Sequence, residues 1–325
     1  MSIRRSAVAG VGHHLPERMV ENDWFATFLD TSDEWIRART GIARRHYAAE
    51  NETTSDLAAQ AARQALADSG MAVDGVDAII VATSTPDLTF PATATIVQEK
   101  LGMTRGFAFD VQAVCAGFVY ALAQADALIV SGMADRVLVI GAETFSRILD
   151  WTDRTTCVLF GDGAGAVLLE AVEGAGGPDD RGILACDLQS DGRHRSILRV
   201  SGGVSATGTV GHLEMAGKEV FRHAVEKLAR CTVDVMGKAG LELSDIDRVV
   251  PHQANVRIIA RTADKLGVPM EKVTVTVAEH GNTSAASIPL AMSVAKGRGD
   301  FSPGDIVVTE AIGGGLAWGA AVLRW

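Results

Sequence analysis

The sequence predicts an α/β fold built from two similar halves, and two observations support this prediction. Apolar runs rich in Val, Ile and Ala alternate with helix-like segments along the whole chain, which is typical of α/β proteins. These runs lack polar alternation, so their strands should be buried on both faces. Similar strings also recur in the same order at offsets of 165 to 170 residues, for example VDAIIVA from residue 76 and IDRVVPH from residue 246, which indicates a duplicated domain.

The apolar run near the N-terminus predicts the first strand. His13 and His14 break this run before it reaches the length of a secretion signal. Further along the first half, the spacing of apolar residues predicts helices over 55–70 and 93–102 and strands over 76–82 and 136–142.

A segment rich in Gly, Pro and Asp, EGAGGPDDRG at 173–182, predicts the boundary between the two halves. We therefore expect one domain over residues 1–172 and a second over residues 173–325. Two similar halves packed around a pseudo-twofold axis bring equivalent strand ends together. Each half should then contribute residues to one shared site.

The composition of the chain excludes several classes of protein. With 325 residues and a net charge of −10, it is not expected to bind nucleic acid through its overall charge. Its four cysteines are far apart and form no C-x-x-C pair, so we expect no metal site and no disulfide framework. A reducing, cytoplasmic location is the expected one. No apolar run is long enough to cross a bilayer.

The stretch FDVQAVCAGFVYAL at 109–122 predicts a short strand, one cysteine, and then an apolar helix. Cys115 would lie at the helix N-terminus, where the helix dipole lowers the pKa of a thiol and favours a nucleophile. The alternative is a buried cysteine that only packs. The stretch alone leaves both interpretations open.

The second half carries two comparable transitions. VVPHQANVRI at 249–258 predicts a strand that ends near His252, and VAEHGNTSAASIPLAM at 277–292 predicts a strand, a turn at Asn282 and a helix. Taken singly, His252 could be a core residue and Asn282 a helix cap. A thiol, an imidazole and an amide at three strand ends of a duplicated fold favour a nucleophilic site. The glycine-rich FGDGAGA lacks the lysine of a phosphate-binding loop and indicates close packing of strand and helix.

The motifs CAGF, PHQAN and HGNTSAASIP together resemble those of β-ketoacyl-acyl-carrier-protein synthase III, the initiating condensing enzymes of bacterial fatty acid synthesis. The resemblance covers essentially the whole chain. It implies a thiolase-like duplicated fold in five layers (αβαβα), a homodimer, no permanently bound cofactor, and a coenzyme A thioester as substrate. The further matching segments are TSDEWIRARTGI (31–42), WTDR (151–154), FGDGAGAVLL (160–169), MAGKEVF (215–221) and GGGLAWG (313–319).

The resemblance also implies a reaction, the decarboxylative Claisen condensation of a short acyl-coenzyme A, with acetyl-coenzyme A as the expected primer, and malonyl-acyl-carrier protein. Cys115 would accept the acyl group, and His252 and Asn282 would hydrogen-bond the malonyl thioester oxygen. Backbone N–H groups of Cys115 and Gly314 would form the oxyanion hole.

Other activities of the same fold stay open at this point. One is a ketosynthase of secondary metabolism, and another is an acyltransferase to oxygen or nitrogen. An ordinary thiolase is disfavoured because no cysteine follows Cys231. A non-catalytic acyl-binding protein is disfavoured because all three catalytic residue types are present.

The resemblance further implies a coenzyme A groove and an acyl pocket. Thr155 follows Arg154 at a position where glycine is common in the family. The exact contacts at the edge of the adenine site therefore stay open, whereas the expected reaction is unchanged. Leu159 and Phe90 match acyl-pocket positions, with Phe90 expected from the partner subunit. Trp35 and Arg154 would hold the adenine, Arg39 and Thr40 would contact the ribose or phosphates, and Gly217, Phe221, Ala254 and Asn255 would line the pantetheine tunnel.

A basic stripe near the tunnel predicts a docking face on this acidic protein. Arg257, Arg261 and Lys265 follow i, i+4, i+8 spacing and lie on one side of a predicted helix. The alternative is a solvated face whose positive charge is relieved by Asp264 and Glu219. Because an acyl carrier protein is acidic, we expect it to dock here, against Gln253, Ala254, Asn255, Val256, Arg257, Arg222, Arg261 and Lys265.

Overall fold

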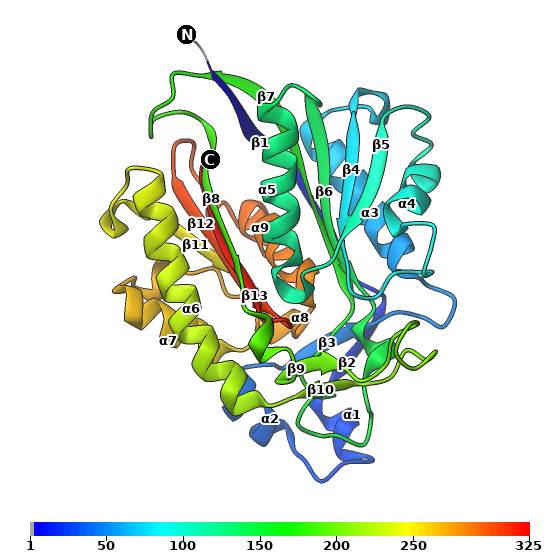
Figure 1. Cartoon of the computed structure of the whole chain (residues 1–325). Helices are drawn as coiled ribbons and strands as arrows, with labels where there is room; N and C mark the ends of the chain where they lie inside the picture. Colours follow the sequence, from blue (N-terminus) through cyan, green and yellow to red (C-terminus); the bar gives the residue numbers. More distant parts are fainter. Residues whose placement is uncertain (1–2) are drawn as a thin grey trace.

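A computed structural model describes residues 3–325 and contains two mixed β-sheets with helices on both faces of each (Figure 1). The first sheet has the strand order β1-β7-β6-β4-β5 and the second β11-β12-β13-β8. The first sheet comprises β1 (Ile3–His14), β4 (Ala78–Ala82), β5 (Phe107–Val111), β6 (Arg136–Glu143) and β7 (Gly163–Gly174). The second comprises β8 (Gly182–Ser190), β11 (Arg248–Pro251), β12 (Ile306–Gly313) and β13 (Ala317–Arg324).

Five layers follow one another across the molecule, as Figure 1 shows. One outer pair of helices covers the first sheet, a central pair fills the space between the sheets, and another outer pair covers the second sheet. Buried apolar clusters fill the spaces between the layers: one lies under each outer pair of helices, and one surrounds the central pair and contacts both sheets. The predicted five-layer α/β fold is therefore confirmed. The outer pairs are α3 (Thr54–Ser69) with α4 (Thr93–Leu101) and α6 (Gly217–Lys238) with α7 (Val256–Leu266); the central pair is α5 (Gly117–Val130) with α9 (Ser287–Arg298).

One parallel strand pair in each sheet has the same register at an offset of 170 residues. Ala78 of β4 pairs with Val137 of β6, and 170 residues later Arg248 of β11 pairs with Val307 of β12, both in parallel. The duplication is therefore visible in the backbone. The counterpart of β5 is reduced to a single bridge between Val249 and Val273. The division of the chain between residues 172 and 173 stays a prediction, and β7 extends to Gly174.

The same 170-residue offset relates two short turns that lead into the central helices. A 3₁₀ turn over Val114–Ala116 precedes α5, and another over Ser284–Ala286 precedes α9. Val114 and Ser284 are the two non-glycine residues with positive φ among the described residues, and both have a φ of 50°. A left-handed conformation is unfavourable for such side chains, so the surrounding packing must hold both turns in place.

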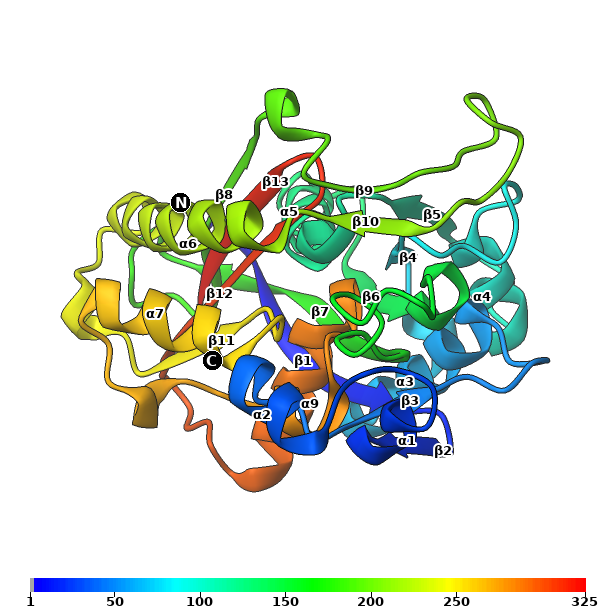
Figure 2. The ribbon, with the colours of Figure 1, turned by 90° about the horizontal axis from the view of Figure 1, so that it is seen from below.

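A smaller cap covers one end of the layers, at the bottom of Figure 1. A hairpin-like pair of strands carries residues 201–212 as an arm that extends away from the body in Figure 2. The cap consists of β2 (Arg18–Glu21), α1 (Asn22–Ala26), α2 (Asp33–Thr40), β3 (Arg44–Tyr47), β9 (Leu198–Val200) and β10 (Leu213–Met215).

Most predicted elements are confirmed within two residues at their ends, and one is wrong. Val277–His280 forms a short helix, α8, instead of the predicted strand. The glycine-rich segment packs as predicted, because a Cβ on Gly165 would lie 2.3 Å from the backbone nitrogen of Leu290 in α9. Within residues 3–325, no helix combines the length and apolarity needed to span a membrane.

Candidate active site

Cys115 lies in the turn between β5 and α5, directly before the helix. The side chain is 5% exposed, and burial raises the pKa of its thiol to about 12. This direction is opposite to the one predicted from the helix dipole, because the cost of desolvating a thiolate outweighs the favourable helix end. Cys115 lies at the predicted position before the helix, but a thiol with this pKa would need a further source of activation to act as a nucleophile.

His252 follows β11 and is also buried. Its Nδ1 lies 2.6 Å from Oγ of Ser287, at the start of α9, and this hydroxyl oxygen also accepts a hydrogen bond from the Gln253 backbone N–H. Burial lowers the pKa of His252 to about 3, so the imidazole is neutral near pH 7. No local sequence pattern links residues 252 and 287, and sequence reasoning missed Ser287 for that reason.

Asn282 follows α8 instead of a strand, and the first half of the chain holds it in place. Its backbone N–H donates to Leu159 O, and its carbonyl accepts from the Gly161 N–H. The side-chain Oδ1 accepts a hydrogen bond of 2.9 Å from the Ser284 N–H, so the amide NH₂ is oriented away from that turn.

One cavity of about 500 Å³ brings Cys115, His252 and Asn282 together. The two halves therefore meet at one site, as the duplication predicts. The predicted groove residues that line the same cavity are Trp35, Arg39, Thr40, Leu159, Gly217, Phe221, Ala254 and Asn255. Among the described residues, no cluster of three or more His, Cys, Asp or Glu side chains could hold a metal ion.

The cavity carries aromatic and cationic groups at Trp35. The guanidinium carbon atoms of Arg39 and Arg154 lie 4.6 Å and 5.3 Å from the Trp35 ring centroid. Arg154 also contacts the Asp30 carbonyl and carboxylate. An indole face with two cations suits a nucleotide base and its phosphates. The Thr40 hydroxyl donates to Ile36 O, which leaves no O–H for the predicted contact with a phosphate.

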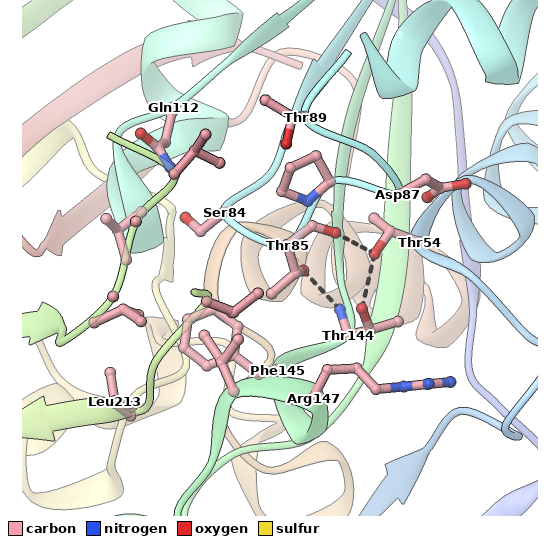
Figure 3. A pocket seen from close by; sticks show the side chains of 18 of the residues that line it. Thr54, Ser84, Thr85, Asp87, Thr89, Gln112, Thr144, Phe145, Arg147 and Leu213 are labelled. Carbon is pink, nitrogen blue, oxygen red and sulfur yellow. Dashed lines mark hydrogen bonds between the residues drawn. The ribbon is translucent and has the colours of Figure 1, made fainter. Parts of the chain in front are cut away.

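A second, larger cavity of about 940 Å³ adjoins the first, and Val114 and Gly314 line it (Figure 3). Polar side chains gather on one wall, where Thr85 accepts a hydrogen bond of 2.9 Å from the Thr144 N–H. The β9–β10 arm forms the opposite wall. Sequence reasoning missed this cavity because the arm brings together residues that are far apart in the chain.

One predicted docking residue, Gln253, does not lie at the surface. Gln253 is 1% exposed, and its amide bonds Pro251 O and Thr274 O, so it cannot belong to the predicted docking surface. The Gln253 amide instead hydrogen-bonds buried carbonyl groups of two neighbouring backbone segments. Phe90 is 82% exposed and lines neither cavity of its own chain.

Comparisons with known proteins show which family the chain resembles. The family model described as "3-Oxoacyl-[acyl-carrier-protein (ACP)] synthase III" matches residues 109–192, and its C-terminal counterpart matches residues 236–325. The chain is 68% identical over 321 residues to the β-ketoacyl-[acyl-carrier-protein] synthase III of Ruegeria pomeroyi, covering 99% of both chains. It is also 68% identical to that of Paracoccus denitrificans, covering 99% of this chain and 100% of the relative.

Solved structures give the same result. The synthase III of Aquifex aeolicus matches with a TM-score of 0.93 at 44% identity, covering 98% of this chain and 100% of that one. The Thermus thermophilus synthase III matches with a TM-score of 0.92 at 46% identity, covering 98% and 99%. Fold and site together define a thiolase-like condensing enzyme. Within that class, the chain belongs to the β-ketoacyl-[acyl-carrier-protein] synthase III family.

Proposed function

We propose that this chain is the initiating condensing enzyme of a bacterial fatty acid synthesis system, acting in the cytoplasm. It condenses a short acyl-coenzyme A, with acetyl-coenzyme A as primer, with malonyl-acyl-carrier protein and forms a 3-oxoacyl-carrier protein. The observation that carries this proposal is the meeting of Cys115, His252 and Asn282 in one cavity with a Trp–Arg cluster. The reaction uses these side chains and the two thioesters, without a permanently bound cofactor.

In the first half-reaction, the Cys115 sulfur attacks the thioester carbonyl carbon of the primer. The carbon–sulfur bond to coenzyme A breaks, and the acyl group stays on Cys115. The backbone N–H groups of Cys115 and Gly314 stabilise the oxyanion. Support comes from the close approach of the glycine turn, since a Cβ on Gly313 would lie 2.7 Å from the Cys115 nitrogen. Trp35, Arg39 and Arg154 hold the nucleotide end, and Gly217, Phe221, Ala254 and Asn255 line the tunnel for the pantetheine arm.

In the second half-reaction, the malonyl group loses carbon dioxide and leaves an enolate. A neutral His252 with the Ser287 O–H donating to Nδ1 presents Nε2–H as a donor. The Asn282 NH₂ is the second donor, since its Oδ1 is already bonded. Two fixed donors stabilise the enolate oxygen, and the carbanion carbon attacks the acyl carbon on Cys115. Cys115 then leaves as the new carbon–carbon bond is completed.

Two measurements test the proposal together. Intact mass after mixing with acetyl-coenzyme A should show one added acetyl group, and malonyl-carrier protein should then discharge it as 3-oxoacyl-carrier protein. A series of acyl-coenzyme A primers measures the preference for acetyl, which Leu159 in the cavity wall supports. The priming β-ketosynthase of the R1128 polyketide pathway has a TM-score of 0.93 to this chain at 34% identity. A clear preference for primers longer than acetyl would favour a comparable role in secondary metabolism.

Charge reversal on α7 tests carrier-protein docking. The side chains of Arg257, Arg261 and Lys265 are exposed, and Arg257 lies over the Phe221 ring at the tunnel. Arg257→Glu with Arg261→Glu should weaken binding of malonyl-carrier protein roughly tenfold at low salt, and the difference from wild type should shrink as salt rises. Self-acylation by acetyl-coenzyme A should change much less. Ala254, Asn255, Val256 and Arg222 complete the proposed surface.

The matched control for this variant is Arg230→Glu. Arg230 is exposed on α6, pairs with Asp234, and lies about 20 Å along the helix from Gly217. It should leave binding of the carrier protein unchanged. An equal loss with both substrates, or a loss that does not depend on salt, would exclude docking on α7.

We also propose that the enzyme is a homodimer in which Phe90 of one subunit reaches the acyl pocket of the other. The support is the exposure of Leu88 and Phe90 on the loop beside the larger cavity, which a second copy would bury. Sedimentation of wild type should give twice the chain mass. Phe90→Asp should shift the enzyme toward monomer and lower its activity; a wild-type monomer with full activity would contradict this proposal.

A further inference from the structure

A third cavity, of about 420 Å³, lies in the cap and has no role in the reaction described so far. Four aromatic residues line it, Trp24, Phe28, Tyr47 and Trp151, together with one charged residue, Arg18. It shares no lining residue with either cavity of the active site. Aromatic walls around one cation make this cavity a candidate binding site for a small molecule.

The pairing of β2 with β3 explains why Arg18 reaches this cavity. Arg18 lies directly opposite Tyr47 in the antiparallel register, so the two side chains share one face of the strand pair. Side chains alternate between the two faces along a strand, which puts Glu21 and Arg44 on the opposite face. Glu21, the one acidic residue of β2, is therefore directed away from Arg18.

The Arg18 guanidinium stacks on two aromatic rings and keeps its N–H donors free. Its central carbon lies 5.3 Å from the Trp24 ring centroid and 5.9 Å from that of Tyr47. Within residues 3–325 it has no ion-pair partner and no carboxylate lines the cavity, whereas Arg44 on the opposite face pairs with Glu279 at 3.2 Å. A guanidinium held flat in this way presents a row of donors that matches a carboxylate.

The aromatic walls meet one another edge to face. The Trp151 ring centroid lies 5.7 Å from that of Trp24 and 5.4 Å from that of Tyr47, with interplanar angles of 86° and 88°. Phe28 lies 4.8 Å from Trp24 and is 45% exposed. Rings at these angles offer both edges and faces, which suits contact with one more aromatic ring.

We propose that this cavity binds a small aromatic carboxylate. The carboxylate accepts hydrogen bonds from the Arg18 guanidinium, and the aromatic ring packs against Trp24, Phe28 and Trp151. An anion is favoured over a cation, because Arg18 already supplies the positive charge on the rings and no acidic side chain of residues 3–325 lines the cavity. The site is separate from Cys115, so this inference does not rest on the proposed function.

One segment of the chain contributes to both this cavity and the active site. Ser146 lines the third cavity, and its neighbour Phe145 lines both cavities of the active site. Trp151 precedes Arg154, which lies over the Trp35 ring, by three residues. A carboxylate bound here would contact this segment without entering the reaction cavity, so its role would be that of an effector and not of a substrate.

The test is a titration of the enzyme, labelled with fluorinated tryptophan, with phenylacetate as the probe. The chain has five tryptophans, and each fluorine NMR signal is assigned by replacing one of them with phenylalanine. The signals of Trp24 and Trp151 should shift, and those of Trp35, Trp318 and Trp325 should not. Saturating coenzyme A should not displace the probe.

Arg18→Gln should weaken binding of phenylacetate about tenfold, because the charged hydrogen bonds to the carboxylate are lost. Arg44→Gln is the matched control, since Arg44 lies on the opposite face of the same strand pair, and it should leave binding unchanged. Phenylacetamide tests the charge without any substitution and should bind wild type about tenfold more weakly than phenylacetate.

Four results would overturn the proposal. They are equal binding of phenylacetamide, tighter binding of octanoate (an alkyl carboxylate with as many heavy atoms as phenylacetate), displacement by coenzyme A, and the absence of shifts at Trp24 and Trp151 at about 20 mM probe, above the Kd expected for a ligand of this size. Acetylation of Cys115 is measured on the same samples. Its failure would refute the proposed function and leave the carboxylate site unaffected.

Discussion

Replacing Cys115 with alanine is expected to abolish acyl-enzyme formation, with a loss in condensation rate of roughly 10⁴-fold or more. The reason is that no other thiol can take its place. Cys157 and Cys231 are buried outside the cavity, and Cys186 lies on β8 in the second sheet. The measurement is intact mass after exposure to acetyl-coenzyme A, followed by peptide mapping.

Cys186→Ala provides the control for this result, since Cys186 is the most exposed of the other three cysteines. It should acylate at the wild-type rate. Acetyl label on Cys157, Cys186 or Cys231 in the Cys115→Ala variant would remove the basis of the proposed mechanism.

His252→Ala and Asn282→Ala should each slow malonyl decarboxylation by about 10²–10³-fold, because each removes one of the two proposed donors to the enolate oxygen. Acetylation of Cys115 should persist in both variants, since the thiol does not depend on these donors. The two half-reactions are measured separately, as acetyl uptake by mass and as release of labelled carbon dioxide from malonyl-carrier protein.

The pH dependence of decarboxylation provides a second criterion. The pKa of His252 is lowered to about 3, so the imidazole stays neutral at every pH well above that value. Wild-type decarboxylation should therefore be flat from pH 5 to 8, with no inflection near the usual histidine pKa of about 6.5. An inflection there, or variants that decarboxylate normally yet fail to acylate, would contradict the assigned roles.

Sequence patterns could predict the architecture because the apolar residues of buried strands and helices recur at the spacing of each element. The repeated apolar strings predicted the duplication, and the register of β4 with β6 and of β11 with β12 has the same offset. Cys115, His252 and Asn282 could be located from their motifs, and the structure brings them into one cavity.

Other features depend on contacts between segments far apart in the chain. Val277–His280 has apolar residues that suit a strand, but the segment forms a short helix, and the outer edge of β11 is bridged at Val273 instead. Gln253 stands beside His252 in the sequence, yet its amide is used by buried carbonyls. Glu143 is one acidic residue at the end of β6, and nothing local shows that it is buried.

The two equivalent turns before α5 and α9 carry different residues at the same place: Cys115 in one and Ala285 in the other. An ancestral assembly of two identical halves would have had the same residue at both places. Fusion into one chain frees each copy to diverge under separate selection. The first turn carries the cysteine that we propose as nucleophile. In the second turn, Ala285 lies against Gly117, and this close contact leaves room only for a small side chain. Among relatives, the position equivalent to Ala285 should therefore hold only residues as small as alanine or glycine, whereas the position equivalent to Cys115 should keep its cysteine.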